Sequence, residues 1–298
     1  MRTRTLWVLT VAALVLAGCG GEDDDAGKPT VLTTFTVLAD MVRNVAGDRV
    51  EVASITKPGA EIHGYEPTPS DLKRAAGADL IFENGLGLER WFEQFVERAA
   101  AERVTLSDGV EPIPIAGGSE YAGKPNPHAW MSVGTALTYV ENVRAALTKL
   151  DPAGADTFAR NADRYAARLS AVRDAVKQEL AGVPASRRAL VTCEGAFSYM
   201  ARDFGLEEGY LWPVNAEQEG TPRQIAATIA FVRERQVPAV FCESTVSDKA
   251  QRQVAAETGA RFGGVLYVDS LSTPSGPVPT YEELLRRDAE TIVAGLTR

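Results

Sequence analysis

One long stretch without helix-breaking residues most constrains the fold of this chain. Within residues 152–181 the only glycine is Gly154, and no proline follows Pro152. Asp151 can cap a helix that starts here, Pro152 suits its first turn, and Gly182 ends the pattern. Apolar residues recur at steps of three and four, which predicts one packed face on a helix of roughly 45 Å.

Strand and helix patterns alternate on both sides of this segment. Strands are predicted at 30–36, 50–56, 78–83, 103–106, 188–193, 209–213, 238–243 and 263–269. Helices are predicted at 38–46, 70–76, 88–101, 222–236, 248–258 and 280–296. Such alternation favours parallel sheets with ligand sites at the carboxyl ends of the strands. We therefore predict an α/β protein with an N-terminal lobe (30–151), a linking helix (152–181) and a C-terminal lobe (182–298).

The N-terminus predicts export and anchoring. Arg2 and Arg4 precede an apolar run at 6–16 that is too short to span a bilayer, so residues 1–18 are typical of a signal peptide. Leu-Ala-Gly-Cys at 16–19 resembles a bacterial lipobox, which implies lipidation of Cys19; an ordinary secretory signal is the alternative. Residues 19–29 would then hold the lipidated cysteine and a flexible acidic tether. We expect an extracytoplasmic protein, periplasmic or at the cell surface, anchored to the bacterial membrane.

Composition and missing motifs exclude several functions. The 40 acidic residues exceed the 31 basic ones by nine, which argues against nucleic-acid binding. The chain contains only two histidines, so a site with three imidazoles is excluded. The sequence has no Gly-x-Ser-x-Gly elbow, no HExxH signature, no zinc-ribbon cysteine pairs and no phosphate-binding P-loop.

Four residues at strand ends and in loops are candidate metal ligands. His63 lies in a loop rich in proline and glycine after a predicted strand, and His128 lies in a turn before a helix. Glu194 and Asp269 lie at the carboxyl ends of predicted strands in the second half. Singly, each could be a surface residue or a helix cap. Together, two imidazoles and two carboxylates predict a divalent-cation site, and the carboxylate oxygens suit Mn²⁺.

The two remaining cysteines also end predicted strands. Cys193 and Cys242 are each followed by a glutamate. Adjacent parallel strands lie about 4.8 Å apart, within the Cα separation of about 4.4–6.8 Å that a disulfide needs. Because exported proteins retain disulfides, we expect a Cys193–Cys242 bond, with two buried free thiols as the alternative. Glu243 could support the metal site or make structural hydrogen bonds. Trp130 and Trp212 could line a cleft that holds the metal or belong to the core.

At these motifs the sequence resembles the metal-binding lipoproteins of ABC importers for manganese, zinc or iron, the cluster A-I substrate-binding proteins. The family's four ligand motifs are similar to PGAEIHGYEPTPSD, NPHAWMS, CEGAFSYMARDFGL and VLYVDSLS in this chain. The resemblance implies that the metal ligands are His63, His128, Glu194 and Asp269. Asn126 replaces an aspartate that is usual in the second motif. The manganese branch in particular resembles YLWPVNAEQEGTP, and the chain lacks the third-position histidine and His-rich loop of zinc-specific members.

The resemblance implies two (β/α)₄ lobes joined by a rigid helix, with the metal in the cleft between them. It also implies capture and delivery rather than catalysis, with no catalytic residue and no resident cofactor. We expect a monomer that binds Mn²⁺, docks on the membrane permease of an ABC transporter and releases the ion for import. Zn²⁺ or Fe²⁺ is the alternative cargo. The alternative functions are a secreted metal-dependent hydrolase or redox enzyme using the same four residues, and a purely adhesive lipoprotein.

Overall fold

The computed structural model describes residues 27–96, 101–116, 121–215 and 220–297. The predicted signal peptide (1–18), Cys19 and the tether up to residue 26 lie outside the described residues. Within the described ranges, no helix combines the length and the apolar character needed to cross a membrane.

The first lobe is built on a parallel sheet. Its strands are β1 (Thr30–Thr33), β2 (Glu51–Ser54), β3 (Leu80–Glu83) and β4 (Glu102–Thr105). Its helices are α1 (Thr36–Ala46), α2 (Pro69–Ala76), α3 (Arg90–Val96), the 3₁₀ helix η1 (Ala129–Met131) and α4 (Val133–Leu150). The strand order is β2-β1-β3-β4, and Val31 pairs with Val52 on one side and Leu80 on the other. The central strands β1 and β3 are largely buried, as apolar strands covered by helices should be.

The second lobe repeats the alternation. Its strands are β5 (Ala189–Glu194), β6 (Glu207–Trp212), β7 (Ala239–Glu243) and β8 (Arg261–Leu266). Its helices are α6 (Ser198–Phe204), α7 (Pro222–Arg235), α8 (Lys249–Thr258) and α9 (Tyr281–Thr297). β5 pairs in parallel with β6, and β7 pairs in parallel with β8. β5 and β7 lie side by side without a backbone ladder between them. Both lobes are therefore parallel α/β units, as predicted.

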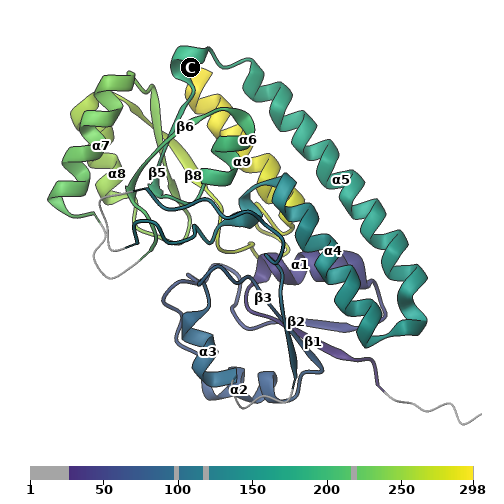
Figure 1. Ribbon diagram of the computed structural model, residues 1–298. Helices are drawn as coiled ribbons and strands as arrows, with labels where there is room; N and C mark the ends of the chain where they lie inside the picture. Colours follow the sequence, from purple (N-terminus) through teal and green to yellow (C-terminus); the bar gives the residue numbers. More distant parts are fainter. Residues whose placement is uncertain (1–26, 97–100, 117–120, 216–219, 298) are drawn as a thin grey trace, which may run out of the picture.

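The predicted long helix connects the lobes. Pro152–Gly154 form a 3₁₀ turn, η2, and the α-helix α5 continues without interruption over Ala155–Ala181. The Asp151 side chain accepts a hydrogen bond from the backbone N–H of Gly154 at the start of this turn. Figure 1 shows α5 running along one side of the molecule from the first lobe to the second. Its 27 residues span about 40 Å, and the chain then passes through η3 (Ala185–Arg187) into β5.

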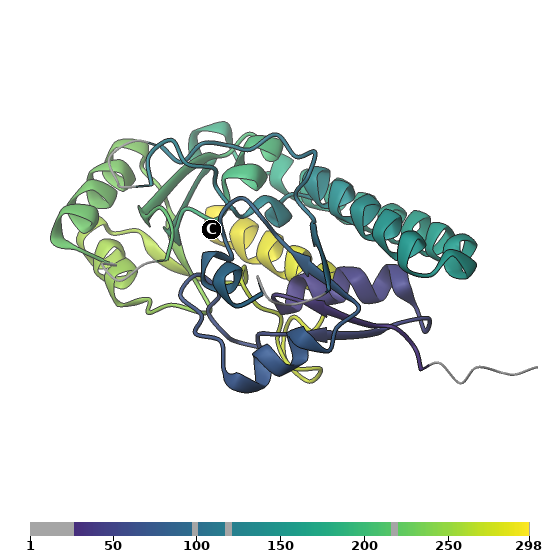
Figure 2. The ribbon, with the colours of Figure 1, turned by 60° about the horizontal axis from the view of Figure 1, so that its bottom comes forward.

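One large apolar cluster runs through both lobes. α5 packs on α1 and α4 of the first lobe and on α9 of the second, an arrangement that Figure 2 shows from a second direction. The buried stripe of α5 includes Tyr165 and Leu169, and the same cluster contains Leu38 of α1 and Leu284 of α9. Because this cluster includes residues of both lobes, burial of apolar surface couples the two lobes.

Side-chain caps fix where two of the helices begin. At the start of α2, Thr68 accepts a hydrogen bond from the Asp71 backbone, while the Asp71 carboxylate accepts one from the Thr68 N–H. Thr221 and Gln224 form the same capping box at the start of α7. Each box ends a loop at the carboxyl end of a sheet, which is where a ligand site is expected.

The structure differs from the predicted elements mainly at their ends. The strand predicted over 263–269 occupies 261–266, so Asp269 lies in the loop beyond it. The strand predicted over 30–36 ends at Thr33, because α1 begins at Thr36. The sequence patterns did not delimit α4, whose amphipathic pattern is weak because it packs against several elements.

Candidate metal centre

The four predicted ligands converge at one point. His63 Nε2 lies 3.1 Å from His128 Nε2 and 3.2 Å from Glu194 Oε1. It also lies 3.9 Å from Asp269 Oδ1, and His128 Nε2 lies 3.4 Å from Glu194 Oε1. One ligand atom from each residue lies within 4.8 Å of all the others. Four side chains that are far apart in the sequence thus form a single polar cluster.

Each ligand is placed by the end of a strand or the start of a helix. His63 lies in the loop between β2 and α2, and His128 immediately precedes η1. Glu194 is the last residue of β5, and Asp269 lies three residues after β8. The imidazoles therefore come from the part of the chain before α5 and the carboxylates from the part after it.

Burial dominates the electrostatics of the cluster. The side chains of His128, Glu194 and Asp269 are fully buried, and that of His63 is 5% exposed. Burial lowers the pKa of His63 and lowers the pKa of His128 to about 3, so both rings are neutral at pH 7. Burial raises the pKa of Glu194 to about 7 and raises that of Asp269 well above its ordinary value. Neutral imidazoles can offer a lone pair to a cation, and a cation would favour the charged carboxylates.

Two carboxylate oxygens in the cluster have no hydrogen-bond partner. They are Glu194 Oε2 and Asp269 Oδ1, and both are buried. A buried polar atom without a partner costs free energy unless something else satisfies it. A divalent cation among these oxygens and the two Nε2 atoms would satisfy them all. The donor set therefore fits a metal ion.

Asn126 fixes the orientation of the His128 ring. Its Nδ2 donates to the carbonyl oxygen of Gly195 at 2.7 Å, so its Oδ1 must be the atom that faces His128. The Oδ1 accepts hydrogen bonds from the His128 backbone N–H at 3.0 Å and from Nδ1 at 2.8 Å. His128 therefore carries its proton on Nδ1, which leaves the Nε2 lone pair for a metal.

Two residues that the sequence patterns did not reveal hold the carboxylates. The backbone N–H of Asn215 donates to Glu194 Oε1 at 2.8 Å. Asp269 Oδ2 accepts hydrogen bonds from Thr245 Oγ1 at 3.1 Å and from Asn215 Nδ2 at 3.4 Å. Trp212 donates from Nε1 to Asn215 Oδ1 at 2.8 Å. Trp212 is 3% exposed, so it supports the site through Asn215 from within the second lobe's core.

Glu243 and Trp130 also contact the ligands. Glu243 Oε2 accepts a hydrogen bond from the Glu194 backbone N–H at 3.1 Å, so Glu243 braces the strand end that carries a ligand. Burial raises the pKa of Glu243 well above its ordinary value. The Trp130 ring lies 5.2 Å from the His128 ring, and its Nε1 donates to the Val268 carbonyl. Because Trp130 is fully buried, it is both a core residue and a wall of the site.

Hydrogen bonds within the loop that carries His63, and one from this loop to the second lobe, fix its conformation. The Glu61 carboxylate accepts hydrogen bonds from the backbone N–H groups of His63 and Gly64, at 2.7 and 2.9 Å. The Gly59 N–H donates to Ser270 Oγ at 2.7 Å, next to the predicted ligand Asp269. A contact between the two lobes therefore helps to position His63, the least buried of the four predicted ligands.

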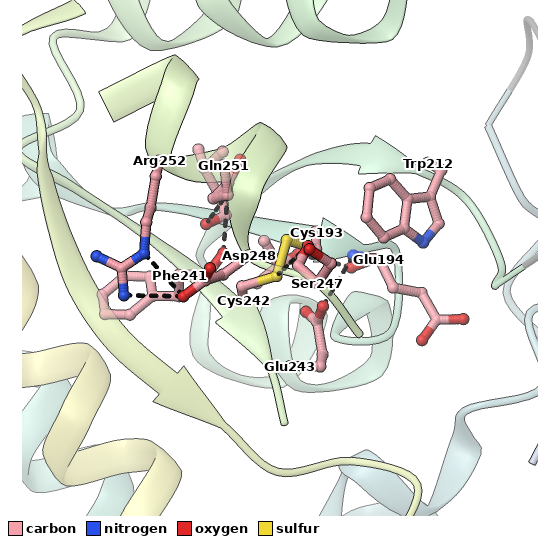
Figure 3. Close-up of a disulfide and its surroundings, with 12 residues drawn as sticks. Cys193, Glu194, Trp212, Phe241, Cys242, Glu243, Ser247, Asp248, Gln251 and Arg252 are labelled. Atoms are coloured by element: carbon pink, nitrogen blue, oxygen red, sulfur yellow. Dashed lines mark hydrogen bonds and ion pairs between the residues drawn. A yellow bond between two sulfur atoms is a disulfide. The ribbon is translucent and has the colours of Figure 1, made fainter. Parts of the chain in front are cut away.

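A disulfide joins the two strand ends behind the site. Cys193 and Cys242 are bonded, with a Cα separation of 4.8 Å, as the sequence analysis predicted. Figure 3 shows the bond between β5 and β7, with Glu194 and Glu243 beside it. The bond holds together two neighbouring strands that no backbone ladder joins.

A buried set of two imidazoles and two carboxylates between two α/β lobes has the donors that a protein needs to hold a divalent metal. The chain belongs to the family described as zinc-uptake complex component A, periplasmic (ZnuA), whose model matches residues 31–295. This membership confirms the resemblance to metal-binding proteins of ABC importers.

Individual relatives cover nearly the whole chain. The iron-binding protein YfeA of Yersinia pestis is 52% identical over 273 residues, which are 91% of this chain and 88% of that protein. The manganese-binding lipoprotein MntA of Halalkalibacterium halodurans is 33% identical over 297 residues, 98% of both. A manganese-bound mutant of a periplasmic metal binding protein from Candidatus Liberibacter asiaticus has a TM-score of 0.86 at 39% identity, over 90% of this chain and 100% of that one.

Membership of this family establishes the class of function. The protein is an extracytoplasmic substrate-binding protein that binds a divalent metal for ABC import, and it is not an enzyme. The predicted hydrolase or redox alternative is therefore not favoured. The names of these proteins do not agree on one metal. The two relatives are named for iron and for manganese, and the family description names zinc.

Proposed function

We propose that this protein captures Mn²⁺ with His63, His128, Glu194 and Asp269 and delivers it to the permease of an ABC importer. The observation that carries the proposal is the convergence of these four ligand atoms within 4.8 Å, with two buried carboxylate oxygens lacking partners. The uncompensated polar atoms point to a cation as the missing component.

The hydrogen bonds to the carboxylates support manganese over zinc. Asp269 Oδ2 accepts two hydrogen bonds, so its free oxygen, Oδ1, is the one available to a metal. Glu194 Oε1 accepts one bond and Oε2 accepts none, which leaves both oxygens able to bind. With two Nε2 atoms, the site offers five donors, which exceeds the four that zinc prefers and includes the oxygens that suit manganese.

Fe²⁺ is the second candidate cargo. The relative that is 52% identical to this chain is named as iron-binding, and the same nitrogen and oxygen donors suit Fe²⁺. Competition between Mn²⁺, Fe²⁺ and Zn²⁺ under anaerobic conditions would rank them. In that experiment the relevant quantity is the ratio of affinities, because the Irving–Williams order favours zinc at many nitrogen and oxygen sites.

We also propose that the chain is anchored outside the cytoplasm. Cleavage after residue 18 would expose Cys19 for lipidation, and the acidic stretch up to residue 29 would tether the folded part, 30–298. Relatives named as lipoproteins support this layout. The protein would act as a monomer. Its N-terminal lobe (30–151), linking helix (152–181) and C-terminal lobe (182–298) would dock on the permease as one unit.

Four single alanine variants test the ligand set. Removing any one of His63, His128, Glu194 or Asp269 should weaken Mn²⁺ binding at least about a hundredfold, because each loss leaves the ion short of one donor in a buried site. Isothermal titration measures the change. Glu89→Ala is the matched control, since Glu89 is a buried carboxyl bonded to Thr34 and outside the cluster. Near-native Mn²⁺ affinity in any of the four variants would remove that residue from the site.

A further inference from the structure

Asn126 connects the two parts of the chain that supply the metal ligands. It lies two residues before His128, and its side chain is buried. Its Nδ2 donates to the carbonyl oxygen of Gly195, which follows Glu194, at 2.7 Å, and to Ser198 Oγ at 3.1 Å. Its Oδ1 accepts both hydrogen bonds from His128. The Asn126 amide thus contacts His128, which precedes α5 in the chain, and also the turn after Glu194, which follows α5.

Only a side chain with both a donor and an acceptor can make this connection. An aspartate at position 126 would keep the acceptor for His128, but it would place a carboxylate oxygen against the Gly195 carbonyl oxygen. Two acceptors at that distance repel, and the buried carbonyl would lose its partner. The requirement for an amide therefore comes from the turn after Glu194 and not from His128.

The groups that Asn126 connects are themselves fixed. The Gly195 N–H donates to the Trp212 carbonyl at 2.9 Å, which anchors the turn to β6. The Tyr199 hydroxyl donates to the Asn126 carbonyl at 2.8 Å, which anchors the backbone of Asn126 to α6. Because both sides are held, the length of the Asn126 amide sets the separation between the His128 loop and the Glu194 turn.

We propose that Asn126 is a positioning residue that holds His128 and Glu194 at the separation at which one metal ion contacts both. Their ligand atoms, His128 Nε2 and Glu194 Oε1, lie 3.4 Å apart. The proposal rests on the proposed function, because the two residues must bind one ion. Without the Nδ2 bond, the two loops separate more easily and the ion leaves faster.

Asn126→Asp tests this role, and Asn142→Asp is the matched control. Asn142 lies on α4, and its Nδ2 donates to the carbonyl oxygens of Leu106 and Asp108, both at 2.9 Å. Both variants place a carboxylate against backbone carbonyls, but the contacts of Asn142 stay within the first lobe. A general loss of stability would affect both variants, whereas a loss of ligand spacing would affect only the first.

Three measurements give the outcome. Asn126→Asp should lower Mn²⁺ affinity about 10–100-fold, as loss of a ligand's supporting partner usually does, mainly through faster release of Mn²⁺ to a chelator. It should also change the EPR spectrum of bound Mn²⁺ and speed amide hydrogen exchange at residues 195–201 in the metal-free protein. Asn142→Asp should leave the Mn²⁺ affinity, the release rate and the exchange at 195–201 within about twofold of wild type and the EPR spectrum unchanged, because the contacts of Asn142 lie within the first lobe, away from the metal site.

Unchanged exchange at 195–201 in Asn126→Asp would overturn the proposal, as would affinity within twofold of wild type or an equal loss in the control. If Asn126→Asp does not fold, Ser198→Ala replaces it, because it removes one acceptor of Nδ2 and leaves residue 126 intact. It should lower the affinity about threefold to tenfold, and no loss there would also overturn the role. Failure of the wild type to bind Mn²⁺ would refute the proposed function instead, while the exchange data would still decide whether Asn126 holds the turn.

Discussion

Replacing Cys193 and Cys242 together by alanine should destabilise the protein by about 4 kcal/mol. The bond joins residues separated by 49 positions. Closing a loop of that length removes about 14 cal/mol/K of entropy from the unfolded chain, or about 4 kcal/mol at 25 °C. Both cysteines are fully buried in the apolar cluster of the second lobe, so the packing lost with the sulfur atoms adds to this figure.

The same change should also weaken metal binding. β5 and β7 share no backbone ladder. Apart from the disulfide, they are joined by Gln251, whose Nε2 donates to the carbonyls of Val191 and Phe241 at 3.1 and 2.9 Å, and by the bond from Glu194 to Glu243. Figure 3 shows Gln251, Phe241, Glu194 and Glu243 around the disulfide. Loss of the covalent link leaves the strand end that carries Glu194 less constrained, so some of the binding free energy must be spent on ordering it.

Urea denaturation of the metal-free protein and titration with Mn²⁺ measure the two effects. Val191→Ala is the control, because Val191 is buried in the same cluster and its truncation leaves the bond in place. A loss below 1 kcal/mol in the double variant would refute the loop-entropy argument. An Mn²⁺ affinity equal to that of wild type would show that the bond stabilises the fold without holding the ligand.

Two further predictions concern selectivity and pH. Glu194→His should shift the metal preference toward Zn²⁺, because it replaces an anionic oxygen donor with a nitrogen. Competition titration with Mn²⁺ and Zn²⁺ measures the shift. An unchanged ratio of the two affinities would place Glu194 outside the ligand set. Lowering the pH below 7 should weaken Mn²⁺ binding by up to about tenfold per unit, because burial raises the pKa of Glu194 to about 7 and the metal must displace its proton. Above pH 7 the affinity should level off, and His128, whose pKa burial lowers to about 3, should not compete for protons in this range. An affinity that does not change between pH 7 and 5.5 would contradict the protonation scheme.

Much of the fold could be predicted because its elements are set by local patterns. The α5 helix was predicted from the absence of glycine and proline and from its stripe of apolar residues, and its length is nearly as expected. Strand ends were less predictable. Tyr267 continues the apolar pattern of β8, but its N–H donates to the Asp288 carboxylate of α9 rather than to a neighbouring strand, so the ladder ends at Leu266. A partner from a distant helix leaves no mark in the local pattern.

The candidate ligands were visible in the sequence for a related reason. Each follows a strand or precedes a helix, so its position in the chain already places it at the ligand edge of a sheet. The residues that orient the ligands have no such marker. Asn215 and Thr245 lie in loops after β6 and β7 and reach Glu194 and Asp269 only because the strands lie side by side.

Asn126 shows why ligand identity alone does not describe this site. In the sequence, asparagine stands where the motif usually has aspartate, two residues before His128. For His128 alone the two residues are equivalent, because either side chain can accept a hydrogen bond from Nδ1. The difference becomes apparent only with Gly195, 69 positions away, whose carbonyl requires a donor. The spacing of the ligands thus depends on a pairing between two loops that the fold brings together. Metal binding in this chain therefore depends on the hydrogen bonds between the His128 loop and the Glu194 turn as well as on the four donors.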